Sequence, residues 1–521
     1  MSNEQLRIGR GFAGWALAAA LVALFAGLGA AASGRADSWR GSPPIVGIAD
    51  DAPKYADDGG ATMWAQLQDL GMREARISVD FDPAQPKTIQ EKAFLDRSIA
   101  KAAASGIAVV FSVYPHVPRA LATHTDARVA AFGSYLARLA RTYPEVKRYI
   151  VLNEPNEGFF FAPQYSGRKN VSATIAYKAL AAGYDRLKAV DPKIEVIGLG
   201  LSPDGNGITS TAPVRFIETL GHAYKASGRR KPIMDALAYH IHPRDSRTFG
   251  EKTHFRWPNG GPADLDRIKQ AVWDAFHGTA QPTFAEDDDT QANPLRFVLA
   301  EVAVQVKIQD SLADRYTGSE NVPVADEAWQ AKTYPALMRW FACDRNVSDV
   351  MLFLLIDQQD LKRYQSGLLR IDGSRRPAFD SVKNAIPGLG RCGVERTWRH
   401  SERVFGARAV YGSKVRFPLV QAVFGVSVTA AEDATAKAGL LRMPGPLAPV
   451  NRTLLARSLD RVPGAGGPVL SDTARIRARF LPRLEIHGTF ARGFYRWVIR
   501  VRSAMNTGRT SILVGPELRV G

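Results

Sequence analysis

Two glutamates stand where short apolar runs end. Residues 149–158 read YIVLNEPNEG and residues 297–301 read FVLAE, so each run passes directly into a carboxylate. This pattern is typical of a buried parallel strand whose carboxyl end opens into a polar site. A buried strand does not need a glutamate at its end, and a buried carboxylate is costly unless it is paired. We therefore expect Glu154 and Glu301 each to have a charged partner or a role in chemistry. The plainer alternative for the first motif is a strand-to-helix turn with an N-cap.

Strand-like and helix-like segments alternate between Pro43 and Pro387. The strand candidates are residues 45–48, 75–79, 108–113, 149–152, 195–199, 236–240, 297–300 and 350–355. Helical patterns lie between them, for example at residues 130–142, 173–190, 263–276 and 325–342. Eight strands with intervening helices predict an α/β fold, a (β/α)8 TIM barrel. A doubly wound sheet is the competing arrangement, but no glycine-rich phosphate loop follows the first strand.

A barrel would bring the two glutamates together. Functional residues of this fold lie at the carboxyl ends of the strands, and Glu154 and Glu301 end the fourth and seventh predicted strands. Barrel closure therefore places both carboxylates at the same rim.

The motifs resemble those of the clan A glycoside hydrolases. An Asn-Glu-Pro after strand four with a second glutamate ending strand seven is the pattern of this clan, and the Asn-Glu-Pro-Asn form most resembles families 5 and 39. The resemblance covers about residues 43–387. It implies a glycosidase that retains anomeric configuration through two carboxylates about 5 Å apart. Glu154 is then the general acid/base and Glu301 the nucleophile.

The same resemblance assigns four further residues to the substrate site. Arg76, in the second strand, matches the arginine that holds the nucleophile. Asn153 matches the residue that hydrogen-bonds the sugar 2-hydroxyl. His240 matches the histidine of strand six. Two features depart from the pattern: His242 stands where a tyrosine usually contacts the nucleophile, and the last strand lacks the tryptophan that usually floors the sugar site.

Other candidate contacts rest on residue type alone. Trp257 lies beside Phe255 in a long loop after the sixth strand, and its ring could stack on a sugar. Glu157 is either a carboxylate behind the site or the start of the next helix, and we favour the helix start. No H-E-x-x-H motif occurs, and two cysteines cannot build a metal cage, so we expect neither metal nor cofactor.

The N-terminus resembles an export signal. Arg7 and Arg10 precede an apolar run that continues to about Ala32, followed by small-residue cleavage patterns. Residues 1–38 are therefore predicted to be a secretory signal, and the protein to be secreted or extracytoplasmic. The run is nearly long enough to span a bilayer, so an uncleaved membrane anchor is the alternative. In an oxidising compartment, Cys343 and Cys392 are expected to form a disulfide.

Residues 394–521 form a different kind of segment. They hold 21 Lys and Arg against 8 Asp and Glu, which gives them +13 of the total charge of +17. Short alternating strands such as residues 495–502 (YRWVIRVR) predict a small C-terminal β-sandwich. Its basic character suggests an anionic cell-envelope polymer as partner, whereas nucleic acid is not expected outside the cell. An ordinary solvated surface is the alternative.

The sequence thus predicts three parts: a signal or anchor at residues 1–38, a catalytic barrel at 40–390 and a basic β-rich domain at 394–521. The predicted activity is hydrolysis of O-glycosidic bonds in a β-linked oligo- or polysaccharide. Two alternatives share this fold. One is a catalytically silent barrel that binds envelope polysaccharide, and the other is a transglycosylase with the same two carboxylates.

Overall fold

A computed structural model describes residues 43–287, 291–404, 407–415, 422–444, 450–461, 470–476, 482–488, 490, 493–506 and 508–520. The predicted export signal, residues 1–38, lies outside these described residues. Within the described part of the chain, no helix combines the length and apolarity needed to cross a membrane.

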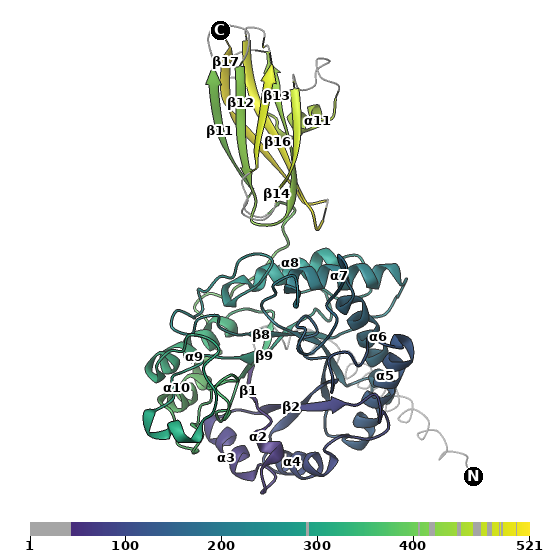
Figure 1. Cartoon of the computed structure of the whole chain (residues 1–521), viewed down its shortest axis with the longest axis vertical. Coiled ribbons are helices and arrows are strands. Elements are labelled where there is room, and N and C mark those ends of the chain that lie inside the picture. Colours follow the sequence, from purple (N-terminus) through teal and green to yellow (C-terminus); the bar gives the residue numbers. More distant parts are fainter. Residues whose placement is uncertain are drawn as a thin grey trace, which may run out of the picture.

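Eight parallel strands close into a barrel, as the sequence predicted (Figure 1). The strands are β1 (Ile45–Ala49), β2 (Glu74–Phe81), β3 (Ala108–Pro115), β4 (Arg148–Val151), β7 (Glu195–Leu201), β8 (Ala236–Ile241), β9 (Phe297–Val302) and β10 (Val347–Leu352). The helices around them are α3 (Ala61–Leu70), α4 (Lys92–Ala104), α5 (Thr125–Thr142), α6 (Ser172–Val190), α7 (Pro213–Ala226), α8 (Leu265–Phe276), α9 (Glu327–Ala342) and α10 (Pro377–Ala385). Smaller elements are α2 (Ala52–Tyr55) and the hairpin of β5 (Tyr165–Ser166) and β6 (Lys169–Asn170).

Side chains alternate between the barrel interior and the layer under the helices. The interior cluster comprises Ala49, Val110, Ile150, Ile197, Ala236, Ala238, Val298, Ala300 and Met351. On β2 the corresponding position is Arg76, which pairs in register with Ala49 on one side and Val110 on the other. A cation therefore enters an otherwise apolar interior, where it requires carboxylate or polar partners.

One strand boundary was predicted wrongly. The eighth barrel strand runs over Val347–Leu352, three residues earlier than the 350–355 run that the sequence suggested. Leu355 and Ile356 lie beyond it, and their backbone N–H groups donate to the carboxylate of Asp50. These hydrogen bonds join the segment after β10 to the loop after β1. They turn the end of the apolar run away from the sheet.

The predicted disulfide is confirmed. Cys343 directly follows α9, and Cys392 lies beyond the last barrel helix, with 5.5 Å between the two Cα atoms. The bridge joins the end of α9 to the segment that leaves the barrel.

The C-terminal segment is a β-sandwich, which confirms the predicted fold class. One sheet contains β11 (Arg408–Val415), β12 (Ala422–Thr429) and β15 (Arg483–Gly488). The other contains β14 (Leu470–Ile476), β13 (Ala434–Met443), β16 (Gly493–Ser503) and β17 (Thr510–Val520), with α11 (Arg452–Ser458) beside it. The alternation in residues 495–502 places Tyr495, Trp497, Ile499 and Val501 on one face of β16, and this face is buried between the sheets.

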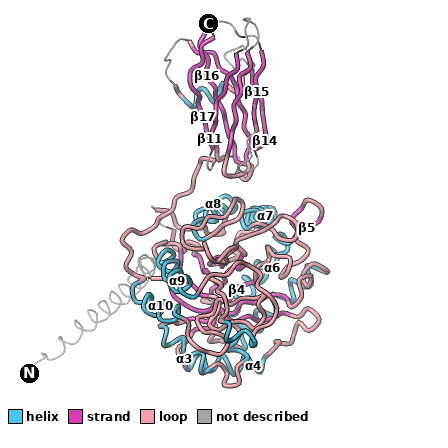
Figure 2. Tube along the Cα trace, turned by 60° about the vertical axis from the view of Figure 1, so that its left-hand side comes forward, coloured by secondary structure: helices cyan, strands magenta, loops and turns pink. Residues whose placement is uncertain are grey.

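Polar contacts join the sandwich to the barrel. In Figures 1 and 2 it stands beside α7 and α8. Arg509 lies 3.1 Å from Asp274 of α8, and Asn506 donates to the same carboxylate over 3.0 Å. Arg215 of α7 pairs with Asp433.

Candidate active site

The turn after β4 places Glu154 at the rim of the barrel. Leu152 and Glu154 both have positive φ, at 72° and 41°, which is uncommon for residues with side chains. The N–H of Glu154 donates to the carbonyl of Gly200 over 2.9 Å. Gly200 also has positive φ, and a Cβ there would lie 3.1 Å from Nε2 of His240. Backbone strain and a close approach are therefore concentrated around one carboxylate, as is common at functional sites.

Glu301 lies in β9 among hydrogen-bond donors. Arg76 forms an ion pair with one carboxylate oxygen, and Nε2 of His242 lies 2.9 Å from the other. Arg76 also donates to Oδ1 of Asn153 over 2.6 Å and to Ser112 over 3.0 Å. Burial alone would raise the pKa of Glu301, but the charge of Arg76 and the hydrogen bond from His242 hold the pKa well below its ordinary value, and His240 adds to this only at low pH, where it is itself protonated. This carboxylate stays ionised.

Glu154 has the opposite environment. Its Oε1 lies 2.7 Å from Nδ1 of His240, a side chain with no exposed surface. Burial, and then the charge of Glu301, raise the pKa of Glu154 to about 8. Burial lowers the pKa of His240 to about 4, so this imidazole is neutral at neutral pH. Glu154 therefore keeps a proton while Glu301, beside it, does not.

The carboxylates face a cleft of about 910 Å³ at the carboxyl ends of the strands. Five of the predicted site residues line it: Arg76, Asn153, Glu154, His242 and Glu301. His240 lies beneath the cleft, in contact with Glu154 rather than with the open space. It is placed to orient Glu154 and does not line the cleft.

Trp257 is not brought to this cleft. Its ring lies beneath the guanidinium of Arg215, 4.7 Å from it, and lines a separate cavity of about 770 Å³ with Asp433 of the β-sandwich. Its neighbour Phe255 lines the carboxylate cleft instead. Residue type identified an aromatic loop here, but it did not identify which ring faces the site.

Glu157 does not begin a helix, contrary to our prediction, since α6 begins at Ser172. It is half-buried and lines the cleft. Burial, and then the charge of Glu154, raise its pKa to about 8. The second carboxylate of the YIVLNEPNEG segment thus also lines the cleft.

Aromatic residues of the cleft were also missed. Tyr364 lies beyond β10, with its ring 5.0 Å from those of both His242 and Phe353. Burial, and then Glu154 and Glu301, raise the pKa of its phenol. A tyrosine does lie near Glu301, but it comes from the loop after β10 and not from the end of β8, where it was expected. Its place in a long loop gave no periodic signal.

The same residues could ligate a metal ion. Ligand atoms of Glu154, His240, His242 and Glu301 all lie within 4.8 Å of one another. Nitrogen and carboxylate ligands of this kind suit divalent transition metals. However, the guanidinium of Arg76 already neutralises Glu301, so the arrangement is explained by the charges present.

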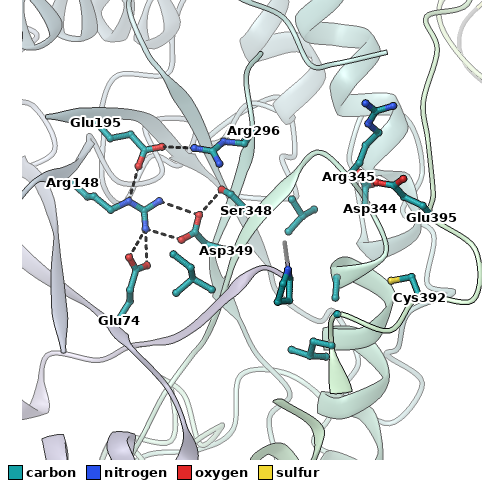
Figure 3. Close-up of a pocket in the computed structure, with 16 residues that line it drawn as sticks. Glu74, Arg148, Glu195, Arg296, Asp344, Arg345, Ser348, Asp349, Cys392 and Glu395 are labelled. Carbon is teal, nitrogen blue, oxygen red and sulfur yellow. Dashed lines mark hydrogen bonds and ion pairs between the residues drawn. The ribbon is translucent and has the colours of Figure 1, made fainter. Parts of the chain in front are cut away.

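A second cluster of charges occupies the amino ends of the strands (Figure 3). Arg148 contacts Glu74, Glu195 and Asp349, each over 2.6 Å. A cavity of about 580 Å³ lies beside it. Burial and Asp349 raise the pKa of Glu74 to about 8 despite Arg148. At this end of a TIM barrel, such charges serve stability rather than chemistry.

Comparison with known proteins gave remote structural matches only. No family model and no curated protein sequence matches the chain. Among solved structures, a family 39 glycoside hydrolase from Bacteroides cellulosilyticus WH2 matches with a TM-score of 0.46 and 14% identity, over 87% of this chain and 82% of that one. A monomeric beta-xylosidase from Caulobacter crescentus CB15 matches with a TM-score of 0.41 and 14% identity, over 91% of this chain and 98% of that one. A glucosidase from Croceicoccus marinus matches with a TM-score of 0.45 and 12% identity, over 87% of this chain and 95% of that one. A family 39 enzyme, one of the two families that the motifs resemble, is thus among the matches.

Proposed function

We propose that this protein is an exported, retaining glycoside hydrolase that cleaves a β-linked oligo- or polysaccharide. The observation that carries the proposal is the contrast between two neighbouring carboxylates. Glu301 is ion-paired with Arg76 and has a lowered pKa, whereas burial and Glu301 itself raise the pKa of Glu154 to about 8. A pair of carboxyl groups with separated pKa values is the arrangement by which one acts as nucleophile and the other as acid.

The separation of the two groups favours retention of configuration. The oxygens that face each other lie within 4.8 Å, which leaves no room for the water molecule that an inverting enzyme holds between its carboxyl groups. Retaining enzymes place these groups about 5 to 5.5 Å apart.

The reaction then proceeds in two displacements. Glu301 attacks the anomeric carbon while Glu154 donates its proton to the departing oxygen, giving a covalent glycosyl-enzyme. Glu154, now ionised, takes a proton from water as the water attacks the same carbon and releases Glu301. Asn153, held by Arg76 over 2.6 Å, is placed to hydrogen-bond the sugar 2-hydroxyl.

Export is supported by two independent features. The disulfide between Cys343 and Cys392 suits an oxidising compartment. The apolar run after Arg10 has the plan of a secretory signal. We further propose that the basic β-sandwich holds the enzyme on an anionic envelope polymer through salt-sensitive contacts.

A panel of aryl β-glycosides tests the activity and separates the roles of the two carboxylates. Glu301→Ala removes the covalent step and should abolish turnover of every substrate. Glu154→Ala should spare the first step for good leaving groups, which need little protonation. Equal losses on activated and unactivated substrates for both variants contradict the assigned roles, and no cleavage by the unaltered enzyme favours the binding-only barrel.

A further inference from the structure

The cations that line the catalytic cleft fall into two kinds. Arg76 is paired with Glu301, and Arg244 is paired with Asp204. Lys362 and Arg363 also line the cleft, and both are exposed. Among the described residues, neither of these two side chains forms an ion pair with a carboxylate. The cleft therefore presents two adjacent positive charges that no carboxylate of the described barrel residues neutralises.

The backbone that carries these cations is fixed. The N–H of Lys362 donates to Oδ1 of Asp360 over 3.0 Å, and its carbonyl accepts from Asn321 over 2.8 Å. The fully buried Gln365 donates to the carbonyls of Gln358 and Asp360. Hydrogen bonds thus fix the backbone of the loop, while the charged groups of Lys362 and Arg363 remain exposed in the cleft. A preorganised loop of this kind reduces the entropy cost of binding.

Arg363 lies on the side of the cleft that carries the acid. Its guanidinium is 5.5 Å from the ring centroid of Phe159, which is 65% exposed. Phe159 follows Glu154 in the same loop, and Phe160 packs edge-on against it at 5.0 Å. Tyr364, which follows Arg363 in the chain, packs its ring against the rings of His242 and Phe353. In a retaining glycosidase, the acid faces the leaving group, so the contact with Phe159 assigns Arg363, and with it the adjacent Lys362, to the leaving-group side.

We propose that Lys362 and Arg363 form a subsite for an anionic saccharide unit on the leaving-group side of the cleaved bond. The inference rests on the proposed glycosidase activity and names its substrate class. Arg363 would pair with a carboxylate or sulfate through its planar guanidinium, Lys362 would act as a second point charge, and Phe159 would supply an apolar face for the sugar ring.

The test compares the full-length protein with a Lys362→Gln/Arg363→Gln double variant. Acidic polysaccharides are offered before and after reduction of their carboxyl groups, or after removal of sulfate, which separates the two sources of charge. Neutral aryl β-glycosides report the basal activity. We expect the double variant to lose about tenfold in kcat/KM on the acidic substrate only, because exposed ion pairs are individually weak. The loss should shrink at high salt.

Arg97→Gln is the matched control. Arg97 also lies over a phenylalanine ring, that of Phe94 on α4, at 5.1 Å, but it does not line the cleft. This variant should cleave acidic and neutral substrates like the unaltered protein. An equal loss of kcat/KM on the acidic substrate in the control and in the double variant would show that the effect arises from general surface charge. That result would overturn the proposal.

Three further outcomes decide the matter. Equal cleavage of an acidic polysaccharide and its neutralised form would overturn the subsite. A loss on aryl uronides, whose anionic sugar lies on the other side of the cleaved bond, would contradict the leaving-group assignment. Binding of short acidic oligosaccharides is also measured with Glu301→Gln, with and without the double substitution. This comparison shows whether the subsite exists even where no substrate is cleaved. Lack of cleavage counts against the glycosidase, and unchanged binding counts against the subsite.

Discussion

The barrel buries charge at both ends, and the two clusters use it differently. At the amino ends, Arg148 shares its guanidinium among Glu74, Glu195 and Asp349. At the carboxyl ends, Arg76 pairs with Glu301, while Glu154 has a neutral histidine as its hydrogen-bond partner. Burial raises the pKa of both Glu74 and Glu154 to about 8, so the two clusters differ in their partners. Arg148 contacts every carboxylate of the first cluster, whereas Glu154 in the second contacts a neutral histidine and faces an open cleft.

The polar atoms left without a partner show the same difference. At the carboxyl ends, Nε of Arg76, Nε2 of His240 and Nδ1 of His242 are buried and without a hydrogen-bond partner within the described part of the chain. Arg148 and Glu74 have no such atom there. Unsatisfied polar atoms cost stability, so the arrangement around Glu154 and Glu301 carries a cost that Arg148 and Glu74 do not.

The largest expected effect separates two glutamates that resemble each other. Glu301 and Glu74 are both buried and both paired with an arginine. Glu301→Gln should reduce kcat/KM by about 10⁴-fold or more, because it removes the proposed nucleophile. Glu74→Gln should retain near-normal kinetics when measured on folded protein. A comparable loss in both variants would erase the functional distinction between the two ends.

Arg148→Ala should have the opposite effect to Glu301→Gln: it should lower stability and leave activity unchanged. Removing the cation leaves three carboxylates close together in a buried site, which should lower the free energy of unfolding by about 3 to 5 kcal/mol. Denaturant titration measures this loss. Activity per folded molecule should be unchanged, since Arg148 lies at the opposite end of the strands from the cleft. Specific inactivation without destabilisation would assign this cluster a role that we do not give it.

The disulfide belongs to the amino-end region, because Cys392 lines the cavity beside that cluster. Cys343→Ser/Cys392→Ser should lower the free energy of unfolding by about 4 kcal/mol, the chain-entropy value for a loop of 49 residues. Thermal or denaturant unfolding of oxidised and variant protein checks this value. The KM for a small aryl glycoside should not change. A selective rise in KM would show that the bridge also shapes the cleft.

The pH profile gives the smallest and most detailed effect. Glu154 acts as an acid only while protonated, so kcat/KM should be high below pH 8 and fall as the pH rises through the Glu154 pKa of about 8. His242 contacts Glu301 over 2.9 Å, on the side of the pair away from the His240 contact of Glu154. His242→Tyr should therefore leave the alkaline limb in place, because that limb belongs to Glu154. A shift of the alkaline limb in this variant would contradict the assignment of that limb to Glu154.

The parts of the site carried by strands could be predicted from the sequence. Glu154, Asn153, Arg76 and Glu301 each lie in or next to a β-rich segment, and barrel closure then determines that they meet. The position of His242 beside Glu301 followed from the resemblance to the clan A enzymes, in which a tyrosine occupies this place.

The parts carried by loops could not be predicted. Lys362, Arg363 and Tyr364 lie in a segment that is positioned by tertiary hydrogen bonds, such as that from Asn321, and not by any periodicity. The shifted end of β10 has the same cause, because the carboxylate of Asp50 that diverts the chain is about 300 residues away in sequence. Trp257 and Phe255 are near neighbours in one loop, and only packing against Arg215 decides which ring leaves the cleft.

The central claim is that Glu301 attacks the sugar and Glu154 protonates the departing oxygen. The most direct test is proton NMR of the first product released from a β-glycoside, recorded before mutarotation. Two displacements at the anomeric carbon predict that the β-anomer appears first. Initial release of the α-anomer would require a single displacement by water, and would contradict the assignment of Glu301 as nucleophile.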